Sequence, residues 1–390
     1  MSVKRWGWLT TGVALALALV LVMTLGPTKD EQNQADSGPL PMAPRLPAPK
    51  DVGPTPTVPA PTPEQVQKQP WMHKLAPGEK PPQFVLFSFD GAVSKQHWDK
   101  VLPIAKRKNA HVTGLLSGVY MLSDQDKMQY QPPAGLKRGV SDISFGGTPQ
   151  DIAARIGYLN QVIDDGHEIG THYNGHFCSG GTQPSVDKWD NKAWNDELAQ
   201  FKQIVDKARA AGFKLPADAV RGGRTPCLEG NWDQAFPAMA AHGLVYDTSK
   251  VALGVQWPTV QNGLYEFPMP EVRVPALGKQ VVMMDFNLWY SLNGAKDEPW
   301  RSPEFAQIVF DTYKSVHQAA LNGNRAPLVI GNHFNEWNGS AFSNAMEQFL
   351  EYVCDKPETV CATYTEVIQW MQLQDPAVLD QLRRMPAARN

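Results

Sequence analysis

The sequence predicts an α/β fold, a distorted (β/α) barrel of about seven parallel strands in one domain that follows an N-terminal segment and a proline-rich linker. Between Pro82 and Gln372, short apolar runs alternate with helical segments, an order typical of parallel strands joined by crossover helices. The chain has 390 residues, enough for one large barrel. Polar residues also stand at the ends of several runs, where a barrel assembles its site.

Short apolar runs are the expected strands, with helices between most of them. In chain order they are QFVLFSF, HVTGLLSG, HEIGTH, DAVRGG, LVYDTS, QVVMMDF and PLVIGNH. One helix start is well marked, because Thr148 can cap the helix, Pro149 lies in its first turn and Asp151 follows three residues after the cap. We find no internal repeat.

The N-terminal segment, residues 1–28, has the composition of a membrane anchor. Lys4 and Arg5 precede a stretch from Trp6 to Thr28 that contains no charged residue and is long enough to cross a bilayer. The basic residues in front predict that the N-terminus lies inside the cytoplasm and the rest of the chain outside. We expect an uncleaved anchor; a cleaved signal peptide, and hence a secreted protein, is the alternative.

Residues 29–81 are expected to form a disordered linker. Proline recurs every few residues between Ser37 and Gln69, and no apolar periodicity is present. Such a segment extends by about 3.1 Å per residue and would hold the following domain away from the membrane. We expect that domain over residues 82–375 and a C-terminal tail over residues 376–390.

The charge balance excludes one class of partner. Lys and Arg number 36, Asp and Glu number 39, and the formal net charge is −3. The chain therefore lacks the basic footprint of a nucleic-acid-binding protein.

The four cysteines form an even set that can be fully paired in an oxidising compartment. Four cysteines allow three pairings. We favour Cys354 with Cys361, which closes a short loop, and Cys178 with Cys227, because each of these two follows a candidate site motif. Four buried free thiols are the alternative.

Four polar residues stand at the carboxyl ends of expected strands. Asp90 follows FVLFSF, His172 follows HEIGT, Arg224 follows AVRGG, and His333 follows PLVIGN. A parallel barrel builds its active site from the loops at this end, so we expect these side chains to meet at one mouth. A polar residue that merely ends a strand would explain one of them better than all four.

The motif GTHYNGHF is the most specific single signal. It places His172 and His176 four residues apart, so that two imidazoles could bind one zinc or similar ion. The preceding DDGHEIG reads as a helix end, a tight turn and a buried strand, which would bring both imidazoles to the mouth. A purely structural pair of histidines is the alternative.

Across the region from Gln83 to Gln372 the chain resembles the polysaccharide deacetylases, carbohydrate esterases that include chitin and peptidoglycan deacetylases. The resemblance lies in an ordered set of motifs: FSFDGAV, DDGHEIGTHYNGH, RTPCLEGNWDQAFPAMAAHGLVYDTS, PLVIGNHFNEW and a closing TYTEVIQWM. It implies a distorted (β/α) barrel and a divalent metal, most often zinc, with cobalt or nickel as alternatives. It also implies that metal-activated water attacks an N- or O-acetyl group on a glycan.

The same resemblance assigns roles to single residues. His172 and His176 match the metal-binding histidines, His333 matches the acid that protonates the leaving amine or alcohol, and Arg224 matches the arginine that orients the base. Asp90 is the expected base. Metal-bound water needs a carboxylate to accept its proton and the leaving group needs an acid, so this pair also makes chemical sense.

The first motif departs from the family pattern, which has two successive aspartates, a base and then a metal ligand. This chain has Asp90 followed by Gly91. Without a gap, Asp90 is the base and Gly91 replaces the ligand; with a one-residue deletion, Asp90 is the ligand and the base is missing. We favour the ungapped alignment, in which His172, His176, water and Asp90 itself would hold the metal more weakly than three protein ligands do.

A second departure is Cys227, which stands where the arginine motif usually has an aromatic residue. Asp285 and Trp289, in MMDFNLWY, are the best match to the family's supporting carboxylate and groove wall, and Trp337 is a further candidate for substrate binding. We therefore expect a metal-dependent deacetylase that acts on an acetylated extracytoplasmic or cell-wall glycan. The alternative is a catalytically inactive, membrane-tethered protein of the same fold that binds glycan.

Overall fold

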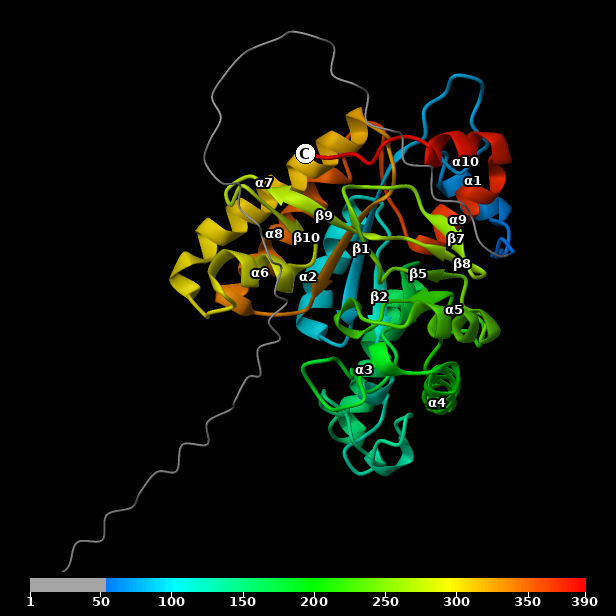
Figure 1. Ribbon diagram of the computed structural model, residues 1–390, viewed down its shortest axis with the longest axis vertical. Helices are drawn as coiled ribbons and strands as arrows, with labels where there is room; N and C mark the ends of the chain where they lie inside the picture. The colour runs from blue at the N-terminus through cyan, green and yellow to red at the C-terminus, as the bar shows by residue number, and fades with distance from the viewer. Residues whose placement is uncertain (1–53) are drawn as a thin grey trace, which may run out of the picture.

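The computed structural model describes residues 54–390, and a curled sheet surrounded by helices forms its centre (Figure 1). The expected anchor and residues 29–53 of the expected linker lie outside the described residues. Within residues 54–390, no helix combines the length and apolar character needed to span a bilayer.

The main sheet has nine strands in the order β11-β1-β2-β3-β4-β5-β8-β7, with β12 also paired to β1. Their bounds are β1 (Gln83–Gly91), β2 (Thr113–Leu116), β3 (Glu168–Thr171), β4 (Gly222–Gly223), β5 (Tyr246–Asp247), β7 (Thr259–Gln261), β8 (Leu264–Glu266), β11 (Leu328–His333) and β12 (Thr359–Cys361). Every pairing except β7 with β8 is parallel. The sheet is a half-barrel that begins at β11 and ends at β7, which confirms the predicted distorted α/β architecture.

Helices cover the outside of the half-barrel. They are α1 (Pro63–Lys68), α2 (Lys95–Arg107), α3 (Pro149–Asp164), α4 (Asn191–Ala210), α5 (Trp232–Ala241), α6 (Asp285–Asn293), α7 (Ser302–Asn322), α8 (Trp337–Val353), α9 (Tyr364–Leu373) and α10 (Pro376–Arg383). Short 3₁₀ helices are η1 (Gly118–Met121), η2 (Lys127–Gln129), η3 (Val186–Lys188), η4 (Pro226–Leu228) and η5 (Pro299–Arg301). The predicted start of α3 is confirmed: Thr148 and Asp151 form a capping box and Pro149 is the first helical residue.

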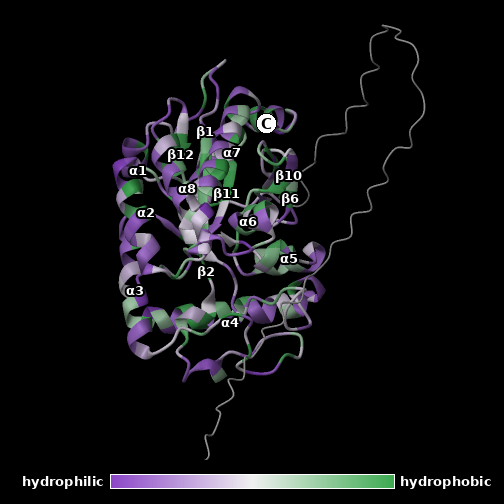
Figure 2. Cartoon of the chain, turned by 90° about the vertical axis from the view of Figure 1, so that its left-hand side faces the viewer, coloured by the Kyte–Doolittle hydropathy of each residue, from purple (hydrophilic) through white to green (hydrophobic). Residues whose placement is uncertain are grey.

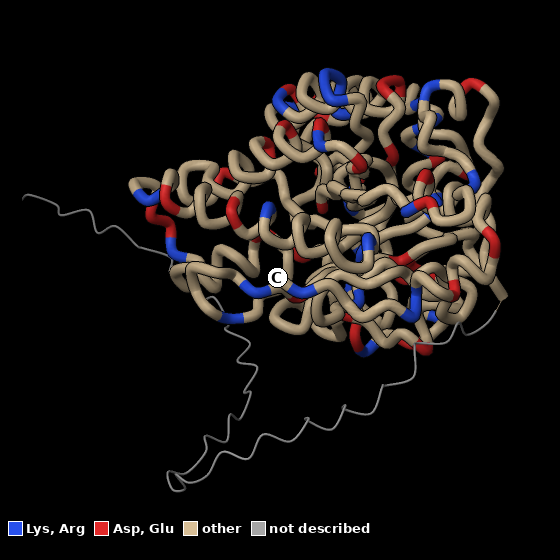
Figure 3. Tube along the Cα trace, turned by 90° about the horizontal axis from the view of Figure 1, so that it is seen from above, with Lys and Arg blue, Asp and Glu red and all other residues tan. Residues whose placement is uncertain are grey.

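The core lies between the sheet and these helices. Strand β1 is buried along nearly its whole length, as expected for a parallel strand covered on both faces. Figure 2 shows the central strands mostly hydrophobic and the outer helices with hydrophilic residues on their outsides. Each fully buried large apolar side chain contributes about 1.5–3 kcal/mol to folding. In Figure 3 acidic and basic residues are interspersed around the periphery.

The expected strand at QVVMMDF is only partly a barrel strand: Met284 forms an isolated parallel bridge with Gly331 of β11, but the rest of the run belongs to another sheet. Lys279–Val282 form β10, which pairs antiparallel with β9 (Met269–Val274); β9 in turn pairs with β6 (Val251–Leu253) in a separate three-stranded sheet. The chain then enters α6 at Asp285. A short apolar run does not distinguish a barrel strand from a strand that leads into a helix, because both are buried.

The described part of the expected linker is packed onto the domain. Thr62 caps α1, the backbone N–H of Val58 donates to Gln372 Oε1 over 2.8 Å, and Met72 is 1 % exposed. The expected tail is also folded, since α10 spans part of it and Ala388 pairs with Val255. Frequent prolines limit regular helices and strands, but the apolar side chains between them can still be buried, so residues 54–81 are packed onto the domain and do not form a disordered linker.

Both favoured disulfides are confirmed, and every cysteine is paired. Cys178–Cys227 joins the loop after β3 to η4, and Cys354–Cys361 joins the end of α8 to β12. The first of these bonds ties together the two loops that carry the histidine and arginine motifs.

Candidate active site

The four strand-end residues lie at the same edge of the half-barrel. Asp90 and His333 are register partners on the neighbouring parallel strands β1 and β11. His172 directly follows β3, and Arg224 directly follows β4. Because the carboxyl ends of parallel strands share one edge, the predicted meeting of these side chains is observed.

Arg224 and Asp90 form a buried ion pair. Arg224 Nη1 donates to Asp90 Oδ1 over 2.8 Å, and the two residues are 0 % and 6 % exposed. Burial raises the pKa of Asp90, but the charges of Arg224 and of the nearby histidines outweigh burial and leave that pKa below its ordinary value. Asp90 is therefore a carboxylate at neutral pH, as a general base requires.

The remaining donors of Arg224 are also engaged, which fixes its orientation. Its Nε donates to the carbonyl oxygen of Thr248 over 3.0 Å, and its Nη2 donates to Ser88 Oγ over 2.9 Å and to Tyr364 Oη over 3.1 Å. Reasoning from the sequence missed these three supporting residues. Tyr364 lies in the closing TYTEV motif, where the capping box of Thr363 and Glu366 at the start of α9 was the available signal.

His172 has the chemistry of a metal ligand. Its Nδ1 donates to the carbonyl oxygen of Arg224 over 2.8 Å, and its Nε2 is buried without a hydrogen-bond partner among the described residues. Burial lowers the pKa of His172 to about 3, so the ring is neutral and its Nε2 carries a lone pair. A buried, unpartnered nitrogen costs stability, which a bound metal ion would recover.

His176 lies close to His172, with 5.1 Å between the ring centroids. Burial lowers its pKa as well, which favours the neutral, metal-binding form. The backbone of His176 is left-handed, with φ of 58°, and its Nδ1 lies 3.7 Å from Cys178 Sγ of the disulfide. Neutral imidazoles of this kind are suitable ligands for a zinc-like ion.

No third protein ligand stands ready beside these histidines. In residues 54–390, the one group of three His, Cys, Asp or Glu ligand atoms that lie within 4.8 Å of one another is His176 with Cys178 and Cys227. Those sulfurs are bonded to each other and offer no thiolate. Gly91, at the family's ligand position, has φ of 83° and no side chain.

His333 is held by a buried carboxylate. Asp285 is 0 % exposed; its Oδ1 accepts from His333 Nδ1 over 2.8 Å and its Oδ2 accepts from the His333 backbone N–H over 2.7 Å. Asn335 Nδ2 also donates to Asp285 Oδ2. Burial alone would lower the pKa of His333, but the charge and hydrogen bond of Asp285 raise it to about 9. His333 is therefore protonated at neutral pH, as a general acid requires.

The contacts of Asp285 agree with the supporting role expected from the sequence. Asp285 has no exposed surface and positions His333, so it fits the supporting carboxylate and not a direct substrate contact. Trp337 does lie beside the site, with its ring centroid 5.7 Å from that of His333, and Trp289 stacks on Trp337 at 4.7 Å.

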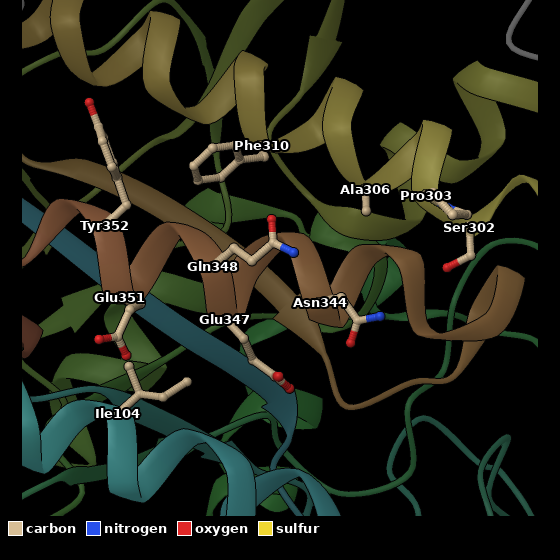
Figure 4. A pocket seen from close by; sticks show the side chains of 10 residues that line it. All are labelled: Ile104, Ser302, Pro303, Ala306, Phe310, Asn344, Glu347, Gln348, Glu351 and Tyr352. Atoms are coloured by element: carbon tan, nitrogen blue, oxygen red, sulfur yellow. The ribbon is translucent and has the colours of Figure 1, made fainter.

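A pocket of about 610 Å³ lies between helices, away from the strand-end residues. Figure 4 shows that its lining comes from α2, α7 and α8, and includes Phe310, Glu347 and Tyr352. None of the strand-end residues lines it.

No protein-family model matches the chain. The chain is 24% identical over 257 residues to chitin deacetylase 8 of Bombyx mori, over 58% of this chain and 60% of that protein, so it spans less than two thirds of this relative. Among solved structures, a putative polysaccharide deacetylase from Mycobacterium smegmatis has 15% identity and a TM-score of 0.49, over 78% of this chain and 96% of the other. A pseudoenzyme of carbohydrate esterase family 4 from Bacillus anthracis has 11% identity and a TM-score of 0.40, over 82% and 72%.

The half-barrel is an α/β fold that brings a carboxylate, histidines and an arginine together at one edge of its sheet. The ordered motifs that carry these residues resemble those of the polysaccharide deacetylases, and the chain is similar to a chitin deacetylase.

Proposed function

We propose that this protein hydrolyses acetyl groups from an extracytoplasmic or cell-wall glycan. The observation that carries the proposal is the pairing of Asp90 with His333 on neighbouring strands. One is an ionised carboxylate and the other a protonated imidazole, so the site holds a base and an acid in their working states at neutral pH.

The chain's own residues divide the work between them. Asp90, held by Arg224, accepts a proton from the attacking water, and His333, held by Asp285, gives a proton to the departing nitrogen or oxygen of the sugar. His172 and His176 would hold a divalent metal, zinc first and cobalt or nickel as alternatives. Such an ion, when bound, polarises the acetyl carbonyl and acidifies water. Asp90, expected from the sequence as a further ligand, is paired with Arg224 and is left as the base.

The glycan and the location are part of the proposal. The relative from Bombyx mori is named a chitin deacetylase, which supports an N-acetylated polysaccharide as the substrate. The uncharged stretch after Lys4 and Arg5 supports a membrane anchor, and two disulfides support an oxidising compartment outside the cytoplasm. Cleavage of the segment would make the protein secreted.

A second candidate function is glycan binding without hydrolysis. The observation that favours it is Gly91, which leaves the two histidines without the usual carboxylate ligand. This candidate predicts that the protein retains acetylated glycan, releases no acetate, and binds glycan equally well after His333→Ala.

The test is acetate release by the purified protein from N-acetylglucosamine oligomers, peptidoglycan and O-acetylated xylan, with bound metal measured in the same samples. We expect Asp90→Asn and His333→Ala to lower turnover by a factor of about 10² to 10⁴. His242→Ala, at the exposed end of α5, is the matched control and should be unchanged. Full turnover in either site variant would refute the roles, and no turnover on any substrate would favour the second candidate.

A further inference from the structure

We infer that Glu197, on α4, is a positioning residue for the proposed metal site. It holds residues 172–176, called here the histidine loop, and thereby sets the spacing of the imidazoles of His172 and His176. The inference rests on the proposed function, because it takes these two histidines as the metal ligands. It adds to that function a residue from a covering helix, outside every motif that carries the family resemblance.

The histidine loop has an unfavourable backbone conformation. Tyr173 and His176 have φ of 59° and 58°, in the left-handed region that residues with a Cβ seldom occupy. Such conformations persist only where the surrounding structure holds them. Contacts from neighbouring elements must therefore fix the loop, and with it the position of His176 relative to His172.

Glu197 holds the middle of the histidine loop. Its Oε1 accepts the backbone N–H of Asn174 over 2.9 Å, and Asn174 Nδ2 donates to the carbonyl oxygen of Glu197 over 3.0 Å. The second carboxyl oxygen, Oε2, accepts from Tyr130 Oη over 2.8 Å, which orients the group. Because Asn174 lies midway between the two histidines, these bonds tie the centre of the loop to α4.

The contact between α4 and the loop is buried and closely packed. Glu197 is 1 % exposed, and Asn174 and Tyr130 have no exposed surface. A Cβ on Gly118 would lie 2.1 Å from Asn174 Oδ1, and a Cβ on Gly175 would lie 2.9 Å from Tyr130 Oη. Loss of the carboxyl group would leave the N–H of Asn174 buried without its acceptor, a state that favours a shift of the loop.

The absence of a carboxylate at Gly91 makes the spacing of the histidines decisive for metal binding. His172 is fixed directly, because its Nδ1 donates to the carbonyl oxygen of Arg224 over 2.8 Å. His176 ends the histidine loop, so its place relative to His172 depends on how the loop is held. Groups that orient metal ligands typically contribute about 10- to 100-fold in metal affinity.

The experiment is a calorimetric titration of the metal-free protein with Zn²⁺ at neutral pH, with acetate release assayed on the same preparations. His172→Ala defines zinc binding elsewhere on the protein. We expect Glu197→Ala to weaken the His172-dependent binding about 10- to 100-fold. Glu197→Gln keeps an oxygen for the N–H of Asn174 and an NH₂ group that can donate to Tyr130 Oη, so it should recover most of the affinity.

Ile204→Ala is the matched control. Ile204 is buried on the same helix, about two turns beyond Glu197, so its truncation weakens the packing of α4 at a distance from the histidine loop. We expect this variant to lower the urea midpoint of unfolding and to bind zinc like the wild type. Tyr130→Phe, which removes only the hydroxyl that orients Glu197, is a milder test and should weaken zinc binding by a smaller factor than Glu197→Ala.

Wild-type zinc affinity in the folded Glu197→Ala protein would overturn the inference, even if acetate is released. If that variant does not fold, unchanged affinity in Tyr130→Phe has the same meaning. Equal losses of affinity in Glu197→Ala and Ile204→Ala, or no His172-dependent zinc binding by the wild type, would also overturn it. Zinc binding that depends on Glu197, without acetate release by any variant, would support the inference and refute the proposed activity.

Discussion

The most direct test of the acid's role is Asp285→Asn, which removes the charge beneath His333 and keeps the side-chain shape. Asp285, which has no exposed surface, accepts three hydrogen bonds from His333 and Asn335. The amide has one acceptor oxygen, and its NH₂ group pairs best with a neutral imidazole. We therefore expect the pKa of His333 to fall from about 9 towards its ordinary value near 6.5.

The size of the effect follows from the same pKa. A rise from 6.5 to about 9 corresponds to at most about 3.5 kcal/mol, at about 1.4 kcal/mol for each tenfold change in proton affinity. The His333 side chain is 32% exposed, so solvent screening reduces this to about 1–2 kcal/mol. Because the folded pKa is the higher one, this stabilisation is complete below pH 6.5 and is lost as the pH rises through about 9.

The assay is an NMR titration of histidine ring signals, with the His333 signal assigned by its loss in His333→Ala. His111, whose Nδ1 lies 2.6 Å from Glu366 Oε1, is the internal reference and should titrate alike in wild type and variant. We also expect acetate release by the variant to decline from near pH 6.5, instead of near pH 9. A His333 midpoint that stays near 9 in the folded Asp285→Asn protein would refute the reasoning.

Three further predictions concern the rest of the site. Gly91→Asp should restore a carboxylate at the family's ligand position and so raise the zinc bound per protein, measured by elemental analysis. The site has room for the side chain, because its Cβ would meet only Tyr120 Cε2 at 3.5 Å. The left-handed backbone should cost about 1 kcal/mol in denaturant unfolding, and unchanged zinc would mean that the new carboxylate does not reach the metal. Replacing Cys178 and Cys227 together by Ser should lower the free energy of unfolding by up to about 4 kcal/mol, since the bond closes a loop with a sequence separation of 49; an unchanged urea midpoint would contradict this. Arg224→Met should destabilise the fold by about 3–5 kcal/mol at neutral pH, because Asp90 would be left charged and buried, and urea unfolding at pH 4 should show a smaller loss; an equal loss at both pH values would exclude this cause.

Local pattern determined much of the fold and the identity of the main site residues. The apolar run of β1 and the capping box at Thr148 depend on neighbours in sequence, so both could be read before any coordinates. Asp90 and His333 were placed correctly because a strand's carboxyl end is itself a local feature. The resemblance to deacetylase motifs supplied the proposed roles, which pattern alone does not give.

Contacts between distant segments required the tertiary structure. Arg224 donates a hydrogen bond to Tyr364, 140 residues further along the chain, and Asp285 accepts one from His333, 48 residues further along. Asp285 also follows β10, an apolar run that resembles a barrel strand but pairs in the separate three-stranded sheet. The burial of Val58 against Gln372 likewise depends on packing between the two ends of the domain. Sequence patterns determine which residues are apolar, charged or able to cap a helix; the curl and register of the sheet determine which of them meet.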